Sequence, residues 1–167
     1  MPQHAGRRHG HDVGCQRFKD SDGDGVDDSK DKCPGTAPGT RVDAVGCPIL
    51  FTPERAPVIL RGVIFETGKS ALKPESFTVL DIVAQSLNAN PDIRIEVAGY
   101  TDNTGSAAGN LRLSQARADA VRTYLASKGV TPDRMIAKGY GAASPIATNA
   151  TSAGRQQNRR VELHQLP

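Results

Sequence analysis

The fold is decided by residues 93–117, which have the sequence IRIEVAGYTDNTGSAAGNLRLSQAR. The first eight of these residues alternate apolar with polar side chains, as is typical of a half-buried β-strand. A loop of glycine and small polar residues follows. Apolar residues then recur three and four positions apart along residues 107–128, which predicts an amphipathic helix. The stretch is therefore a strand that passes through a short loop into a helix.

Strands and helices are also expected on both sides of this stretch. Residues 58–65 are rich in β-branched side chains and predict a strand, while Pro74 begins a helix that ends before Pro91. Two more strands are expected at residues 134–141 and 159–166, with a long loop between them. This order predicts an α/β (α+β) fold in two layers, a four-stranded mixed sheet with two main helices on one face.

Composition limits the classes of function. The chain has 167 residues, of which 37% are apolar and 4% aromatic, enough for a modest aliphatic core. A net charge of +3 without interleaved aromatic residues argues against nucleic acid as a partner. No apolar run approaches the roughly 20 residues that span a bilayer, and the first residues do not form a signal peptide. The chain is cytosolic, or the exported part of a longer chain, or its start is misplaced.

An acidic segment precedes the periodic part of the chain. Residues 20–31, DSDGDGVDDSKD, place acids at the first, third, fifth, ninth and twelfth positions of a loop and a glycine at the sixth. Alternating acids point at a common centre, and hard oxygen ligands in that number suit Ca²⁺. The candidate ligands are Asp20, Asp22, Asp24, Asp28 and Asp31. The alternative is a solvated acidic linker, and the lack of flanking helices excludes a true EF-hand.

The residues that follow, CPGTAPGTRVDAVGCP at positions 33–48, complete a pattern that resembles the thrombospondin type 3 calcium repeat. The matching unit consists of Val42, Asp43, Gly46 and Cys47. The resemblance implies Ca²⁺ as a cofactor and a disulfide between Cys33 and Cys47, a staple that a segment with little apolar core needs. Disulfide and calcium together argue for an extracytoplasmic location. Cys15 is left over, either as a free thiol or as the partner of an upstream cysteine.

A polar constellation surrounds the loop of the opening stretch. Asp102 follows the predicted strand at its carboxyl end, where open α/β sheets bind ligands. Asn110, Ser114 and Arg117 lie four and three residues apart and form one stripe of the next helix. Arg117 can reach back toward Asp102. One hypothesis is a structural salt bridge between the two. The other is a clamp on a zwitterion, with an ammonium at Asp102 and a carboxylate at Arg117.

Three motifs in this region are GYTD (99–102), NLRLSQARA (110–118) and GRQQNRRV (154–161). With them, residues 58–165 closely resemble the OmpA-like C-terminal domain, a family that binds peptidoglycan non-covalently. The resemblance implies that Asp102 and Arg117 grip the diaminopimelate of the peptide stem, and that Thr104 and Asn110 hydrogen-bond the stem.

Arg159 and Gly68 are two further positions of the expected pocket. The resemblance implies that Arg159 adds a cationic contact, whereas the alternative for Arg159 and Arg160 is solubilising charge on an edge strand. Gly68 stands where the family often has an asparagine. The resemblance therefore implies that this contact is lost, or is replaced by Thr67 or by backbone.

The two resemblances predict the domain organisation. Residues 1–14 are expected to be a disordered tail, 15–50 a calcium-binding segment, 51–57 a linker, and 58–167 the peptidoglycan-binding domain. They imply a periplasmic protein of a Gram-negative bacterium, attached to the outer membrane through a region upstream of this sequence. A homodimer is neither required nor excluded.

Three functions compete for this chain. The favoured hypothesis is an anchor between the outer membrane and peptidoglycan, with the calcium segment as a stiff spacer. The second is a calcium-dependent adhesion or protein-interaction module. The third, a cell-wall hydrolase, is disfavoured because the C-terminal domain has a single histidine, His164, and no cysteine. We therefore expect no enzymatic activity.

Overall fold

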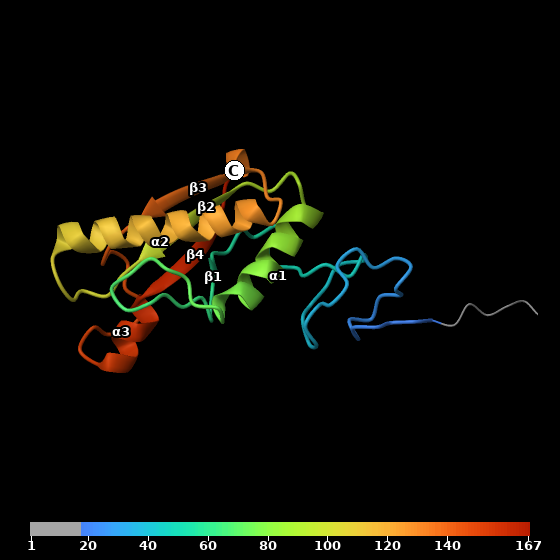
Figure 1. The fold of residues 1–167 in the computed structure, drawn as a ribbon, viewed down its shortest axis with the longest axis horizontal. Coiled ribbons are helices and arrows are strands. Elements are labelled where there is room, and N and C mark those ends of the chain that lie inside the picture. The colour runs from blue at the N-terminus through green and yellow to red at the C-terminus, as the bar shows by residue number, and fades with distance from the viewer. Residues whose placement is uncertain (1–17) are drawn as a thin grey trace, which may run out of the picture.

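The computed structural model describes residues 18–167. The predicted tail at residues 1–14 and Cys15 lie outside the described residues. Figure 1 shows a layered domain with a loop-rich segment on its N-terminal side. The elements are β1 (Val58–Ile59), α1 (Ser76–Ala89), β2 (Ile95–Tyr100), α2 (Ala107–Ser127), a 3₁₀ turn η1 (Pro132–Arg134), β3 (Met135–Gly139), α3 (Ser152–Asn158) and β4 (Arg160–Gln165).

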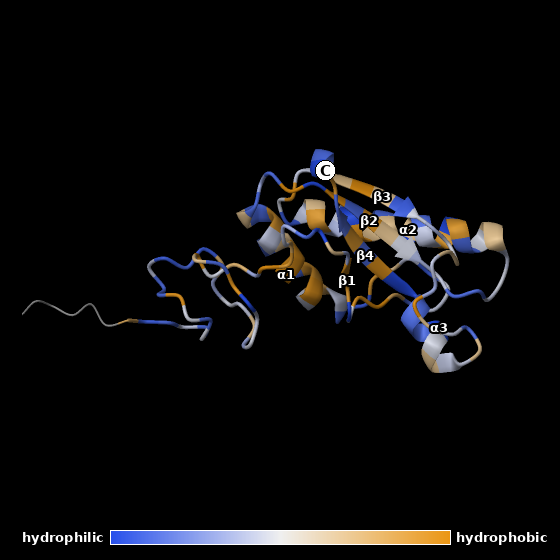
Figure 2. Cartoon of the chain, turned by 180° about the vertical axis from the view of Figure 1, so that it is seen from behind, coloured by the Kyte–Doolittle hydropathy of each residue, from blue (hydrophilic) through white to orange (hydrophobic). Residues whose placement is uncertain are grey.

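The four strands form one mixed sheet in the order β1-β4-β2-β3. Strands β2 and β3 run parallel, and β4 is antiparallel to both of its neighbours. Helices α1 and α2 cover one face, as Figure 1 shows, and Figure 2 looks onto the opposite face. The predicted fold class is confirmed. Within residues 18–167, none of the helices has the length and apolar character to cross a membrane.

The core lies between the sheet and the two main helices. Because side chains alternate along a strand, one set from β2 and β4 faces the helices and the other set faces away. The side chains buried in this layer include Leu80, Leu87, Ile95, Val97, Val121, Leu125, Val161 and Leu163. Burial of this aliphatic surface is what holds α2 and α1 against the sheet.

Two elements differ from the sequence-based expectation. The strand predicted for residues 58–65 is shortened to Val58–Ile59, because the chain turns at Gly62, whose φ is +87°. The long loop predicted before β4 contains a helix, α3, whose N-cap Thr151 accepts a hydrogen bond from the nitrogen of Gly154 at 3.0 Å. The residues of α3 carry no apolar periodicity, so the sequence pattern did not indicate a helix.

Helix α2 approaches the sheet over a pair of glycines. Gly99 of β2 and Gly139 of β3 are directly paired in the sheet. A Cβ atom at Gly99 would collide with the carbonyl oxygen of Ser114, and one at Gly139 with the backbone nitrogen of Gln115. Backbone-to-backbone contact therefore sets the position of α2 above the carboxyl ends of β2 and β3.

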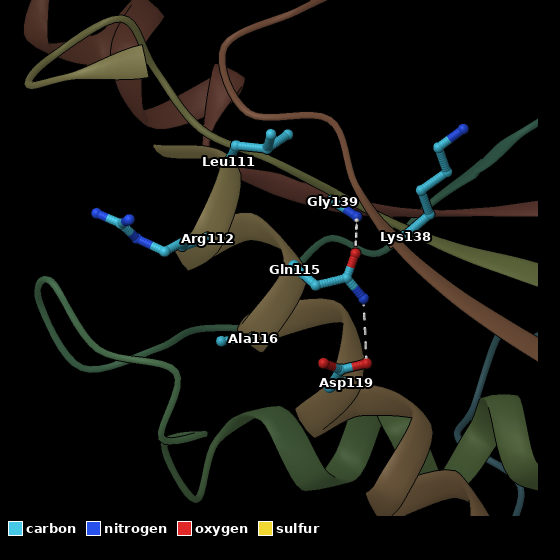
Figure 3. Close-up of a pocket in the computed structure, with 7 residues that line it drawn as sticks. All are labelled: Leu111, Arg112, Gln115, Ala116, Asp119, Lys138 and Gly139. Carbon is cyan, nitrogen blue, oxygen red and sulfur yellow. Dashed lines mark hydrogen bonds between the residues drawn. The ribbon is translucent and has the colours of Figure 1, made fainter. Parts of the chain in front are cut away.

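Side chains of α2 also cap the free edge of β3. The Gln115 amide donates to the carbonyl of Ala137 at 3.0 Å and accepts from the nitrogen of Gly139 at 2.9 Å, and Figure 3 shows the second of these bonds. Arg122 Nε donates to the carbonyl of Met135 at 2.9 Å. These bonds satisfy the backbone groups that an edge strand would otherwise offer to another chain.

The glycine contact predicts the effect of adding one methyl group. Gly139→Ala forces α2 away from β3 and is expected to lower the free energy of unfolding by about 1–3 kcal/mol. Urea unfolding followed by circular dichroism measures this change. Lys138→Ala, at an exposed neighbouring position of the same strand, is the control and is expected to change stability by less than about 0.5 kcal/mol. An unchanged midpoint for Gly139→Ala would contradict the interpretation.

Candidate functional site

Asp102 lies just beyond the end of β2 and is only 7% exposed. One carboxylate oxygen accepts a hydrogen bond from the backbone nitrogen of Thr104 at 2.8 Å, and the other forms an ion pair with Arg159. Burial raises the pKa of Asp102, but the bonds from Thr104 and Arg159 outweigh it and hold the pKa below the usual value for aspartate. The side chain is therefore a fixed anion at neutral pH.

The loop around Asp102 is tied to the first turn of α2. Ser106, the N-cap of α2, accepts from the nitrogen of Gly109 at 3.0 Å. Asn110 Nδ2 donates to the carbonyl oxygen of Asp102 at 3.3 Å. Thr104 contributes its backbone nitrogen to Asp102 while the residue itself remains exposed. The structure thus brings Thr104 and Asn110 to Asp102, as their predicted shared site requires.

Arg117 is 7% exposed and approaches the site from the second turn of α2 beyond Asn110. Its Nε donates to the carbonyl oxygen of Lys69 at 3.0 Å, and its guanidinium carbon lies 5.0 Å from the centre of the Phe65 ring. Burial lowers the pKa of Arg117, and the nearby charge of Arg159 lowers it further, against the opposing effect of Asp102. Two guanidinium groups therefore share this small region with one carboxylate.

The hypothesis of a salt bridge between Asp102 and Arg117 is wrong, because Arg159 takes that place. The reason lies in the sheet, where Arg160 pairs with Tyr100 at the end of β2 and so brings Arg159 to Asp102. The alternative of solubilising charge on an edge strand is also wrong. Strand β4 lies between β1 and β2, and Arg160 is buried.

Asn158, Arg159 and Arg160 have three different roles. Asn158 is fully buried, and its amide accepts from the nitrogens of Ile146 and Ala147 and donates to two oxygens of the same loop. Arg160 donates to Glu162 at 2.7 Å and lies over the ring of Tyr100 with its guanidinium carbon 4.1 Å from the ring centre. The two flanking residues are fixed by the fold, so the residue between them is held at the site.

One wall of the site has no counterpart among the sequence-based predictions. The loop between β1 and α1 supplies the Phe65 ring and the Lys69 carbonyl that hold Arg117. Gly68 has a φ of +69°, and no atom lies within 4 Å of the position of a Cβ there. The next residue, Lys69, contacts Arg117 through its backbone carbonyl. A backbone carbonyl leaves no signal in a sequence motif. Phe65, an aromatic residue in an apolar segment, looks like an ordinary core residue in the sequence.

The acidic segment gathers part of the predicted ligand set. Carboxylate oxygens of Asp20, Asp22 and Asp24 lie within 4.8 Å of one another. A Cβ at Gly46 would overlap the carboxylates of both Asp24 and Asp31, so these two acids also meet there. Asp28 instead accepts from the nitrogen and hydroxyl of Ser21. The whole predicted set therefore stays a prediction.

Three further features of this segment bear on its predicted metal site and disulfide. The Oδ2 atom of Asp24 is buried and has no hydrogen-bond partner within residues 18–167. Burial, together with the charges of Asp22, Asp31 and Asp20, raises the pKa of Asp24. Cys33 and Cys47 form the disulfide that the resemblance implied, with their Cα atoms 5.0 Å apart. An orphaned buried carboxylate oxygen among other acids fits a bound cation.

Comparison with known proteins gives one family and several relatives. The family model described as OmpA family matches residues 64–159. Outer membrane porin F of Pseudomonas aeruginosa is 42% identical over 144 residues, which cover 86% of this chain and 40% of the porin. The peptidoglycan-binding protein ArfA of Mycobacterium tuberculosis is 45% identical over 101 residues, which cover 60% of this chain and 31% of ArfA.

Solved structures share the fold. The crystal structure of the peptidoglycan-associated lipoprotein from Burkholderia pseudomallei matches with a TM-score of 0.59 and 34% identity, covering 62% of this chain and 88% of that one. The chain spans 40% of porin F and 31% of ArfA, so it corresponds to only part of either relative.

The ion pair at Asp102 predicts a titration and its effect on stability. Arg159→Gln is expected to raise the pKa of Asp102, as measured by carboxyl ¹³C NMR. Because the pKa of Asp102 is lower in the folded chain, its stabilising contribution is present above about pH 4 and is lost as the pH falls through the folded value. The stability difference between wild type and Arg159→Gln should therefore shrink on acidification. Arg112→Gln, at an exposed position of α2, is the control, and an unmoved Asp102 titration would contradict the pairing.

Proposed function

The chain belongs to the OmpA family, and from this membership we propose that its C-terminal domain binds peptidoglycan non-covalently and anchors an outer-membrane protein to the cell wall. The observation that carries the proposal is the convergence of Asp102, Arg117 and Arg159 at the carboxyl end of β2. Relatives named as an outer membrane porin and as a peptidoglycan-binding protein support it. By the same argument, we place the protein in the periplasm, attached to the outer membrane through a region upstream of this sequence.

The ligand that we propose for this site is the diaminopimelate of the peptide stem, whose free end carries an ammonium and a carboxylate on one carbon. Arg117 binds the carboxylate through its terminal nitrogens, which no other residue of the described chain engages. Asp102 accepts the ammonium on the lone pairs left over by Thr104 and Arg159. Thr104 and Asn110 then hydrogen-bond neighbouring parts of the stem.

A binding module fits this site better than an enzyme does. Asp102 is held ionised by its two partners, so it does not serve as a general acid near neutral pH. Arg117 and Arg159 supply positive charge and hydrogen-bond donors. The chemistry that the three side chains offer is recognition of charged groups.

We also propose that the segment before the domain binds Ca²⁺ and so acts as a stiff spacer. Asp20, Asp22 and Asp24 would hold the ion, with Asp31 beside Asp24. A divalent cation neutralises carboxylates that otherwise repel one another, and it gives Asp24 Oδ2 a partner. The disulfide closes the same segment, so ion and disulfide together replace the hydrophobic core that it lacks.

Sacculus pull-down tests the anchor. Asp102→Asn and Arg117→Gln each remove one charged contact and are expected to reduce retention on isolated sacculi by at least about tenfold. Arg112 lies on the same helix, on a different face from Arg117. The Arg112→Gln variant is therefore expected to bind like wild type. Wild-type retention of both site variants, with folding verified by circular dichroism, would contradict the proposal.

Amide hydrogen exchange tests the calcium segment. Adding Ca²⁺ is expected to slow exchange in residues 20–48 and to leave β2 and α2 unchanged, and EDTA should reverse the effect. Asp24→Asn removes one of the three gathered carboxylates and should abolish the response. Identical exchange in residues 20–48 with and without EDTA would show that the segment does not bind the ion.

A further inference from the structure

The charges at the site do not balance. Among the described residues, Asp102 is the one carboxylate whose charge acts on Arg117, and it is already paired with Arg159. Arg117 forms no ion pair within residues 18–167, although it is 7% exposed. A largely buried guanidinium without an anion is costly, because the desolvation of its charge is not repaid. The site therefore carries one unmatched positive charge at Arg117.

The environment of Arg117 directs this charge at one position. The Nε atom is engaged by the Lys69 carbonyl, and the Phe65 ring lies beside the guanidinium. The terminal nitrogens have no hydrogen-bond partner within the described residues, and they are not among the fully buried unpaired atoms. A planar guanidinium held in this way presents two parallel N–H groups, which match the two oxygens of a carboxylate.

From this imbalance we infer that the site distinguishes a free carboxylate from a carboxamide at the amino-acid end of the ligand. The inference rests on the proposed function and adds the chemical state of the stem that the domain accepts. A carboxylate supplies both the missing negative charge and two acceptors. A carboxamide supplies no charge and one acceptor, and its NH₂ group turns a donor toward the donors of Arg117.

Neither of the other two charged residues compensates for a neutral ligand. Asp102 is already bonded to Thr104 and Arg159, so its charge does not replace the missing anion of Arg117. Arg159 adds a second positive charge, although 42% of its side chain is exposed and solvent relieves part of that cost. The lowered pKa of Arg117, caused by burial and then by Arg159, has the same origin. Amidation of the stem therefore leaves Arg117 without its anion.

Calorimetric titration of the full 167-residue chain tests the inference with two synthetic peptides. The first is the tripeptide L-alanyl-γ-D-glutamyl-meso-diaminopimelate. The second is the same tripeptide with a carboxamide in place of the carboxyl group at its free amino-acid end. We expect the wild-type chain to bind the free acid about 10- to 100-fold more tightly than the amide, as the loss of a charged hydrogen-bonding partner predicts.

Variants assign the discrimination to Arg117. Arg117→Gln should weaken binding of the free acid and bring the ratio of the two affinities close to one. Arg117→Lys keeps the charge without the fork, so it should retain part of the ratio. Arg112→Gln removes an exposed guanidinium from the same helix and should leave the ratio unchanged.

The outcomes separate the inference from the proposed function. Equal affinity of the wild-type chain for the two peptides would overturn the inference and leave peptidoglycan binding standing. Failure to bind either peptide or isolated sacculi would overturn both. A ratio that survives in a folded Arg117→Gln chain would show that another group senses the carboxylate, and it would overturn the assignment to Arg117.

Discussion

The structure depends on the close contact between α2 and the paired glycines Gly99 and Gly139. Without side chains at these positions, the backbone of α2 near Ser114 rests directly on the sheet. Ser114 strengthens the contact, since its hydroxyl accepts a hydrogen bond from the nitrogen of Gly141 at 2.9 Å. The helix begins beside the loop that carries Asp102, so this one contact fixes how far Asn110 and Arg117 lie from the end of β2. The distance between the charges is thus a consequence of packing.

Packing also determines how the charges are divided. Strand β4 delivers Arg159 to Asp102 because it pairs with β2, while the loop after β1 holds Arg117 apart from both. Asp102 pairs with Arg159, the more exposed of the two arginines. Arg117, the more buried of the two, forms no ion pair within the described residues. An internal salt bridge at Arg117 would fill the place that we propose for a ligand carboxylate. Under the proposed function, an arginine without an internal anion makes the empty site less stable and the site more selective for an anionic ligand.

Sequence patterns predicted much of this arrangement because several of its parts are local. The alternation in β2 and the periodicity of α2 are visible within single segments, as is the spacing of Asn110, Ser114 and Arg117 along one helix face. The pairing of Arg159 with Asp102 depends on strand order, which joins residues 57 positions apart and has no local signature. The Lys69 carbonyl lies 48 positions from Arg117 and, as a backbone group, leaves no signal in the sequence. Helix α3 was missed because Asn158 and the cap at Thr151 stabilise it in place of an apolar face.

In the run of Asn158, Arg159 and Arg160, the side chain that lies at the candidate site has a structural neighbour on each side. A long arginine on a flexible loop would lose considerable conformational entropy on binding. Asn158 removes much of that freedom by bonding the loop that precedes α3, and Arg160 removes more by stacking on Tyr100 and pairing with Glu162. Because Arg160 lies inside β4, its backbone is fixed by the hydrogen bonds of the sheet as well. The backbone of Arg159 is thereby held from both sides while its side chain stays partly exposed. A charged contact proposed for this side chain would therefore cost less conformational entropy than one made from a flexible loop.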